Sequence, residues 1–199
     1  MHRLAFRILL ALASWVALAL GRAPTVAVAR PAERFYVILG KSEARTQVPA
    51  ALLTATDTTL EIALKKHPRF VRELPNAPDP QKHPDAFKTY LAKQHLRAFT
   101  LRAKIERFDR AEEPAKSGKS GHVLKIGVAL SLLGESVPDK TLAMSGEGSA
   151  TVGLEIGKNV RPRDEQAATQ EALESALAGA LTQFVQKLDA RPRAKPQKQ

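Results

Sequence analysis

The chain has 199 residues, 44% of them apolar, and it carries no cysteine and a formal charge of +11 at pH 7. This length and apolar content predict one globular domain with tails and exclude disorder throughout, and the lack of cysteine excludes disulfides and thiolate metal sites. The basic balance is compatible with binding to nucleic acid, anionic lipid or an anionic cell-wall polymer, and also with a role in solubility alone.

The first 29 residues have the pattern of a secretory signal peptide. Arg3 and Arg7 precede the apolar run ILLALASWVALAL, and small residues follow at Ala27 and Ala29, so we expect cleavage after Ala29 and export. The alternative is an uncleaved membrane anchor, for which the run is short. Since no cysteine can carry a lipid, we expect an exported protein, periplasmic or secreted and not lipid-anchored, for which nucleic acid is the least accessible partner.

We expect three parts in the chain. Residues 1–29 are the signal peptide, residues 30–188 form a single α+β domain, and residues 189–199 are a disordered basic tail, because they lack an apolar period. The signal peptide and the tail each hold a net charge of +3. We expect the remaining +5 to be spread through the domain.

After the signal peptide, the pattern alternates between strands and helices. RFYVIL, residues 34–39, is rich in aromatic and β-branched residues, which predicts a short buried strand. The next segment predicts a helix from Pro49 to Lys66, because its apolar residues recur at helical spacing and Pro49 suits a first turn. Phe70 and Val71 then begin a second short strand.

A proline-rich loop follows, from Pro75 to Pro84, in which each proline fixes its own backbone angle and prevents regular structure. PDAFKTYLAKQHL, residues 84–96, predicts a second helix with one apolar stripe. RAFTLRAKIERF, residues 97–108, predicts a half-buried antiparallel strand, because polar and apolar residues alternate. The side chains that point outward are Thr100, Arg102, Lys104 and Glu106.

Three strands in succession predict a meander. A charged hairpin loop, Asp109 to Gly121, leads to the central strand LKIGVALSLL, residues 124–133, and TLAMSGEGSATVG, residues 141–153, forms the third strand, in which Gly146 and Gly148 indicate a bend or bulge. A long helix follows over residues 164–188. The predicted fold class is α+β, a two-layer sandwich of order β-α-β-α-β-β-β-α, with an antiparallel three-strand meander and helices on one face.

The sequence shows no motif for catalysis or for a cofactor. SGKS, residues 117–120, resembles the end of a phosphate-binding loop, but Glu113 stands where that motif requires glycine. Ser136 in GESVP lacks the final glycine of a nucleophile elbow. The four histidines after the signal peptide have no metal-motif spacing; they are His67, His83, His95 and His122. We therefore expect no catalytic residue, cofactor or metal, although an active site built from distant residues stays an alternative.

The order of these segments resembles two envelope families. DTTLEIALKKHPRFV, YLAKQHLRAFTLRAKIERF, LKIGVALSLLGESVPDKTLAMSGEGSATVG and EALESALAGALTQFVQKL are similar to the periplasmic domains of the curli-secretion channel family and of outer-membrane activators of penicillin-binding proteins. The resemblance covers residues 34–188. It implies a non-catalytic envelope domain that docks another protein, and it assigns no functional residue. The chain departs from both families in lacking their lipid-bearing cysteine.

The leading hypothesis is an exported module that binds another envelope protein without turnover, in an assembly or regulatory role. The expected contact residues are Thr100, Arg102, Lys104 and Glu106, because outward side chains can meet a partner without disturbing the core. One alternative is a hydrolase of an envelope polymer, with an active site built from Pro75–Pro84 and the hairpin loops. The other is electrostatic adhesion of the basic tail to anionic polymer or lipid.

Overall fold

The structure is a computed structural model that describes residues 33–45, 47–114, 121–157 and 159–190. These residues belong to one compact unit that begins at Glu33. The elements in chain order are β1 (Phe35–Leu39), β2 (Glu43–Ala44), α2 (Ala50–Lys66), β3 (Phe70–Val71), α3 (Pro84–Lys93), β4 (Arg97–Pro114), β5 (His122–Ser136), β6 (Leu142–Ile156) and α4 (Pro162–Ala190). The predicted signal peptide lies outside the described residues.

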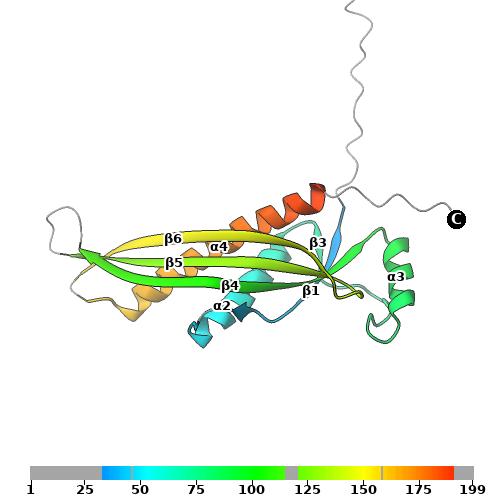
Figure 1. Cartoon of the computed structure of the whole chain (residues 1–199), viewed down its shortest axis with the longest axis horizontal. Helices are drawn as coiled ribbons and strands as arrows, with labels where there is room; N and C mark the ends of the chain where they lie inside the picture. Colours follow the sequence, from blue (N-terminus) through cyan, green and yellow to red (C-terminus); the bar gives the residue numbers. More distant parts are fainter. Residues whose placement is uncertain (1–32, 46, 115–120, 158, 191–199) are drawn as a thin grey trace, which may run out of the picture. The chain divides into compact units, whose positions relative to one another are not determined.

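The strands form one sheet in the order β3-β1-β4-β5-β6, and β2 pairs with β4 beside β1 (Figure 1). β4, β5 and β6 pair antiparallel, whereas β1 runs parallel to both β3 and β4. The α+β class and the meander are therefore confirmed, and the order of elements is as predicted except for the additional short strand β2. The parallel pairs follow from the connections, since each helix returns the chain to the end of the sheet where β1 starts.

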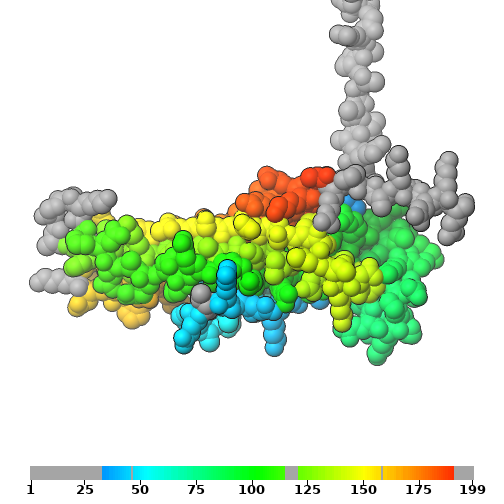
Figure 2. Space-filling model, viewed as in Figure 1, coloured from blue at the N-terminus to red at the C-terminus, as the bar shows by residue number. Residues whose placement is uncertain are grey.

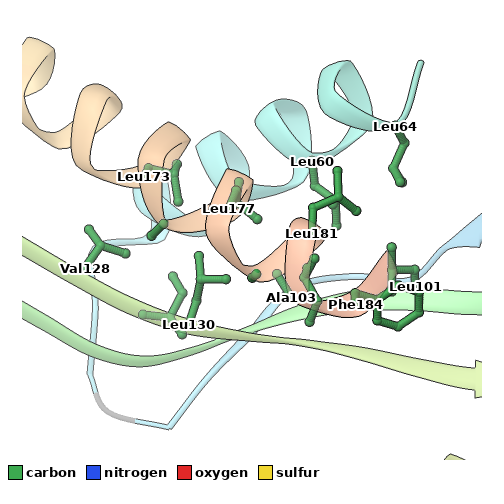
Figure 3. Packing of buried hydrophobic residues seen from close by; sticks show 14 of the residues in the cluster. Leu60, Leu64, Leu101, Ala103, Val128, Leu130, Leu173, Leu177, Leu181 and Phe184 are labelled. Atoms are coloured by element: carbon green, nitrogen blue, oxygen red, sulfur yellow. The ribbon is translucent and has the colours of Figure 1, made fainter. Parts of the chain in front are cut away.

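One face of the sheet is covered by α2 and α4. Apolar residues at every second position of β4 and β5 point to this face, and the leucines of the two helices pack on them (Figure 3). Figure 3 shows Leu60 and Leu64 of α2 beside Leu177 and Leu181 of α4, above Leu101 of β4. Each of these residues is at most 8% exposed. This layer contains most of the apolar burial that stabilises the fold.

Gly146 and Gly148 have a different role from the predicted bend. A Cβ atom on Gly146 would clash with the carbonyl oxygen of Ala180, and one on Gly148 would clash with that of Ala176. Both glycines thus let the backbone of α4 lie directly against β6. The irregularity between β5 and β6 lies elsewhere, where the register shifts between Gly134 and Glu135.

A second, smaller core lies at one end of the opposite face. Phe87 and Leu91 of α3 pack there on Ala98, with the Tyr36 ring edge-on to that of Phe87 at 6.4 Å between centroids. Ala98 points away from the face that Phe99 shares with α4, because successive residues of a strand alternate. α3 therefore covers one end of a face that is otherwise open, whereas we expected all the helices on one face; α2 and α4 alone share the covered face.

The predicted tail begins two residues too early. α4 runs to Ala190, and the Asp189 carboxylate pairs with both terminal guanidinium nitrogens of Arg69, at 2.8 and 2.9 Å. Residues 191–199 lie outside the described residues. Among the helices that the structure describes, none combines the length and the apolar character needed to cross a membrane.

Candidate functional site

The four residues predicted to contact a partner lie together on the open face, which we define as the side of β4, β5 and β6 opposite α2 and α4. In Figure 2 the middle of these strands forms the surface that faces the viewer, with no helix over it. Thr100, Arg102 and Lys104 are partly exposed and alternate with buried residues. Glu106 occupies a bulge, because the register with β5 shifts between Ile105 and Arg107.

The charges of these residues are paired within the chain. Arg102 donates to Glu43 of β2 at 2.6 Å and to Glu135 of β5 at 2.9 Å. Lys104 lies 3.2 Å from Glu106, which also lies 3.7 Å from Arg45. A protein partner would have to compete with these ion pairs, and it would have to offset the free energy that is lost when the charges are taken out of water. The role of the four residues in binding stays a prediction.

The hairpin loop predicted over Asp109 to Gly121 is wrong in its first half. β4 continues as a strand to Pro114, paired with β5 up to His122. Ion pairs flank this ladder, with Arg107 at 2.7 Å from Asp109 and Lys125 at 2.6 Å from Glu113. Since both faces of the strand are solvated here, its residues show no apolar alternation, which is why the sequence indicated a loop.

A second surface is the α2–α4 groove, a cleft of about 520 Å³ between these two helices on their outer side. The helices run in the same direction. Gln170 donates to the Thr59 hydroxyl at 3.2 Å at one end, and Arg69 pairs with Asp189 near the other. The apolar residues of the lining are Ile62, Ala63, Leu177, Ala178, Leu181 and Val185. Ile62 is 47% exposed, which is rare for a large apolar side chain in this structure.

The two ends of the groove carry opposite charges. Glu174 accepts a hydrogen bond from Gln170 at 2.7 Å and has no cationic partner among the described residues. Lys66 and His67 lie at the other end, and Lys66 has no ion pair in the part of the chain that the structure describes. Partial burial, together with the charge of Arg69, holds the pKa of His67 below its ordinary value and so favours the neutral imidazole, which leaves Lys66 as the charge at this end. The groove therefore has an apolar floor, one acidic end and one basic end.

Sequence reasoning missed this groove because it followed the buried stripe of each helix. Ile62 and Val185 lie beside those stripes and were not assigned to the core. An apolar residue outside the buried stripe of an amphipathic helix was the available signal. That α2 and α4 lie side by side could not be seen from the sequence, because they are separated by most of the domain.

Other residues singled out in the sequence do not come together. In the described ranges, no group of three histidine, aspartate or glutamate side chains is arranged to hold a metal ion. Ser136 lies against Thr141, with 2.7 Å between the hydroxyl oxygens. The proline-rich loop is tied to α3 by a hydrogen bond from the Tyr90 hydroxyl to the Pro75 carbonyl at 2.8 Å. The SGKS segment lies outside the described residues.

The positive charge is not spread through the domain, contrary to our expectation. All 20 acidic residues lie within the described residues, but 11 of the 31 basic residues do not. The described part of the chain is therefore neutral. Its excess charge belongs to residues 1–32, to Lys116, Lys119 and Lys158, and to residues 191–199.

No family model matches the chain, and no curated protein matches it. Several solved structures are similar. One from Helicobacter pylori, provisionally described as a homologue of neuraminyllactose-binding hemagglutinin, has 12% identity and a TM-score of 0.47 over 79% of this chain and 83% of its own. A protein from Caulobacter crescentus, provisionally described as a lipoprotein, has 13% identity and a TM-score of 0.37 over 74% of this chain and 87% of its own. A minor lipoprotein from Acinetobacter baumannii has 10% identity and a TM-score of 0.38 over 79% of this chain and 93% of its own.

These descriptions bear on two expectations. They are compatible with an envelope protein, but none of the three names a curli-secretion channel or an activator of penicillin-binding proteins. Two of the similar proteins are described as lipoproteins, against our expectation that the protein is not lipid-anchored. That expectation rested on the absence of cysteine from this chain and on no feature of the fold, and we withdraw it.

Proposed function

We propose that the protein is a non-catalytic envelope module that binds another envelope protein in the α2–α4 groove. The observation that carries this proposal is the exposed apolar lining of the groove around Ile62. Exposed apolar surface of this kind marks interaction sites, and a furrow between two helices accepts the side-chain ridge of a third.

The charges at the two ends of the α2–α4 groove indicate which kind of partner it binds. An amphipathic helix fits, with apolar residues at i, i+3, i+4 and i+7 against the floor. A basic side chain of that helix would meet Glu174, and an acidic one would meet Lys66. These charges fix the direction of the helix more than they add to affinity.

The test compares two exposed apolar residues. Ile62→Glu places a charge in the groove, whereas Leu142→Glu alters a side chain that is 63% exposed and lies outside the groove. Photo-crosslinking from residue 63 in envelope extract, followed by mass spectrometry, identifies the protein that occupies the groove. We expect Ile62→Glu to weaken binding of that protein by at least about tenfold, and Leu142→Glu to leave it unchanged. Equal loss in both variants, or a crosslinked product with a cleaved chain, would contradict the proposal.

A second candidate is adhesion to an anionic polymer or lipid. It is supported by the neutral charge of the described residues, since the excess positive charge is then concentrated on segments such as residues 191–199. Sedimentation with anionic vesicles at low and at physiological salt tests it. Binding that persists after residues 191–199 are removed would count against the tail as the adhesive segment.

A further inference from the structure

β6 is an edge strand, and its outer edge is only half closed. Gln183 of α4 accepts a hydrogen bond from the Glu147 N–H at 3.2 Å, and Lys187 donates to the Ser145 carbonyl at 2.7 Å. These bonds show that the odd-numbered backbone groups of β6 point outward, because the groups that pair with β5 alternate with them. From Ser149 to Glu155 the outward N–H and C=O groups have no hydrogen-bond partner in the described part of the chain.

The sheet has another long free edge, on β4, and its composition differs from that of the β6 edge. β1 and β2 pair with β4 only as far as Ile105, so the outer edge of β4 is free from Arg107 to Pro114. That stretch contains five charged residues and ends in proline, which are the devices that keep an edge from pairing. From Ser149 to Leu154, β6 has no charged residue and no proline. The edge of β6 is therefore unprotected where it is open.

We propose that β6 pairs antiparallel with β6 of a second copy of this chain, about a twofold axis at Val152. In this register Thr151 lies opposite Gly153 of the partner, and Ser149 lies opposite Glu155. All four are outward-pointing residues, so each pair exchanges two backbone hydrogen bonds. The open groups on both copies are then satisfied.

The side chains are complementary to themselves in this register. On the face shared with α4, Val152 meets its own copy and Ala150 meets Leu154, and all three are partly buried apolar residues packed against the core. On the open face, Glu155 meets Ser149. A register moved by two residues would place Glu147 opposite Glu155, which sets like charges together, and would use the N–H that Gln183 already binds.

The pairing closes on itself. The same segment serves both copies, so the interface is isologous and gives a dimer, not a fibre. Pairing of β6 with the free edge of β4 from another copy would give an open chain, and the charges and proline on that edge oppose it.

The experiment uses the full chain, in which an introduced cysteine is unique because the sequence has none. We expect sedimentation velocity to show a dimer. Val152→Cys should form an intermolecular disulfide on oxidation, because Cβ atoms of directly opposite residues lie about 4.5–5.5 Å apart, near the span of a disulfide. The control is Leu154→Cys, whose copies would be offset by four residues, or about 13 Å, and should stay reduced.

A proline variant tests the hydrogen bonds independently. Thr151→Pro removes an outward N–H and leaves the ladder to β5 intact, so it should keep the circular dichroism spectrum of the parent and become monomeric. Thr151→Val, which keeps the N–H, should stay dimeric. A monomeric parent, a dimeric Thr151→Pro variant, or equal crosslinking of the two cysteine variants would overturn the proposal.

Discussion

The two faces of the meander are built on different principles. The face under α2 and α4 is apolar and closely packed, down to glycines that admit the helix backbone. The open face carries polar side chains that pair with each other, as Arg102 does with Glu43 and Glu135, beside a few half-buried apolar residues such as Ala129 and Leu133. The covered face therefore determines stability, while the open face can change at little cost because its charges stay solvated.

The largest effect that separates the two faces comes from neighbouring residues of β5. Leu130 points into the covered face and is 2% exposed, whereas Ser131 points to the open face. Leu130→Asp buries a charge without a partner and should lower the free energy of unfolding by about 4 kcal/mol or more. Ser131→Asp should change it by less than about 1 kcal/mol. Urea unfolding of both variants measures the difference, and equal midpoints would mean that the register of β5 is wrong.

Two glycines of β6 allow the same comparison with the addition of a single methyl group, one next to α4 and one away from it. Gly148→Ala places a Cβ against the backbone of Ala176, so α4 has to move, and we expect a loss of about 1–3 kcal/mol. Gly153→Ala is the matched control, because its Cβ would lie 3.6 Å from the nearest atom of Val123, which is an ordinary contact. Thermal unfolding measures both. A stable Gly148→Ala variant would show that the contact between α4 and β6 is loose.

Much of this fold could be predicted because the covered face leaves a clear pattern. Alternation at Phe99, Leu101, Ala103 and Ile105 showed which face of β4 is buried. Helical spacing predicted both ends of α2 to within one residue. The end of β4 was missed because its strand residues are solvated on both faces, and a charged strand and a charged loop have the same composition. The role of Gly148 depends on a helix 28 residues away, counted to Ala176, which local patterns cannot reveal.

The candidate site was less predictable than the fold. The outward position of Arg102 and Lys104 followed from alternation, but their partners Glu43 and Glu135 come from other strands whose register depends on the whole sheet. The α2–α4 groove required knowledge of which helices are neighbours. Sequence patterns show which side chains face solvent, and the packing of elements decides which of those gather into a surface.

Reversal of charge on the open face should have an intermediate effect. Arg102→Glu with Lys104→Glu would face Glu43, Glu135 and Glu106 with like charge, and we expect a loss of about 1–2 kcal/mol in unfolding free energy. Arg102→Met, which keeps the apolar stem, should cost less. If the partner lies in the groove, the double reversal weakens its binding less than Ile62→Glu does. A larger loss of binding than with Ile62→Glu would favour the open face as the site, as the sequence predicted.

A smaller effect should appear with pH at the end of α4. The hydrogen bond from Arg69 holds the pKa of Asp189 below its ordinary value, so the pair stabilises the fold above the ordinary aspartate pKa and is lost as pH falls through the lower, folded value. Because the Asp189 side chain is 58% exposed, the contribution is less than about 1 kcal/mol. Asp189→Asn should therefore lower the melting temperature slightly at pH 7 and not at pH 2. The same decrease at both pH values would mean that the ion pair does not contribute.

The smallest effect on stability should come from deletion of Ala190 to Gln199. The sequence predicts that residues 191–199 lie outside the domain, so the melting temperature should not change. Their charges can speed the encounter with an acidic partner, but exposed charges are screened by salt and each contributes little. We expect partner binding to weaken by less than about tenfold, or 1.4 kcal/mol, and by less than after the double reversal at Arg102 and Lys104. Calorimetry at two salt concentrations separates these outcomes. Complete loss of binding on deletion, with the double reversal harmless, would assign recognition to the tail and make electrostatic adhesion the better account of the function.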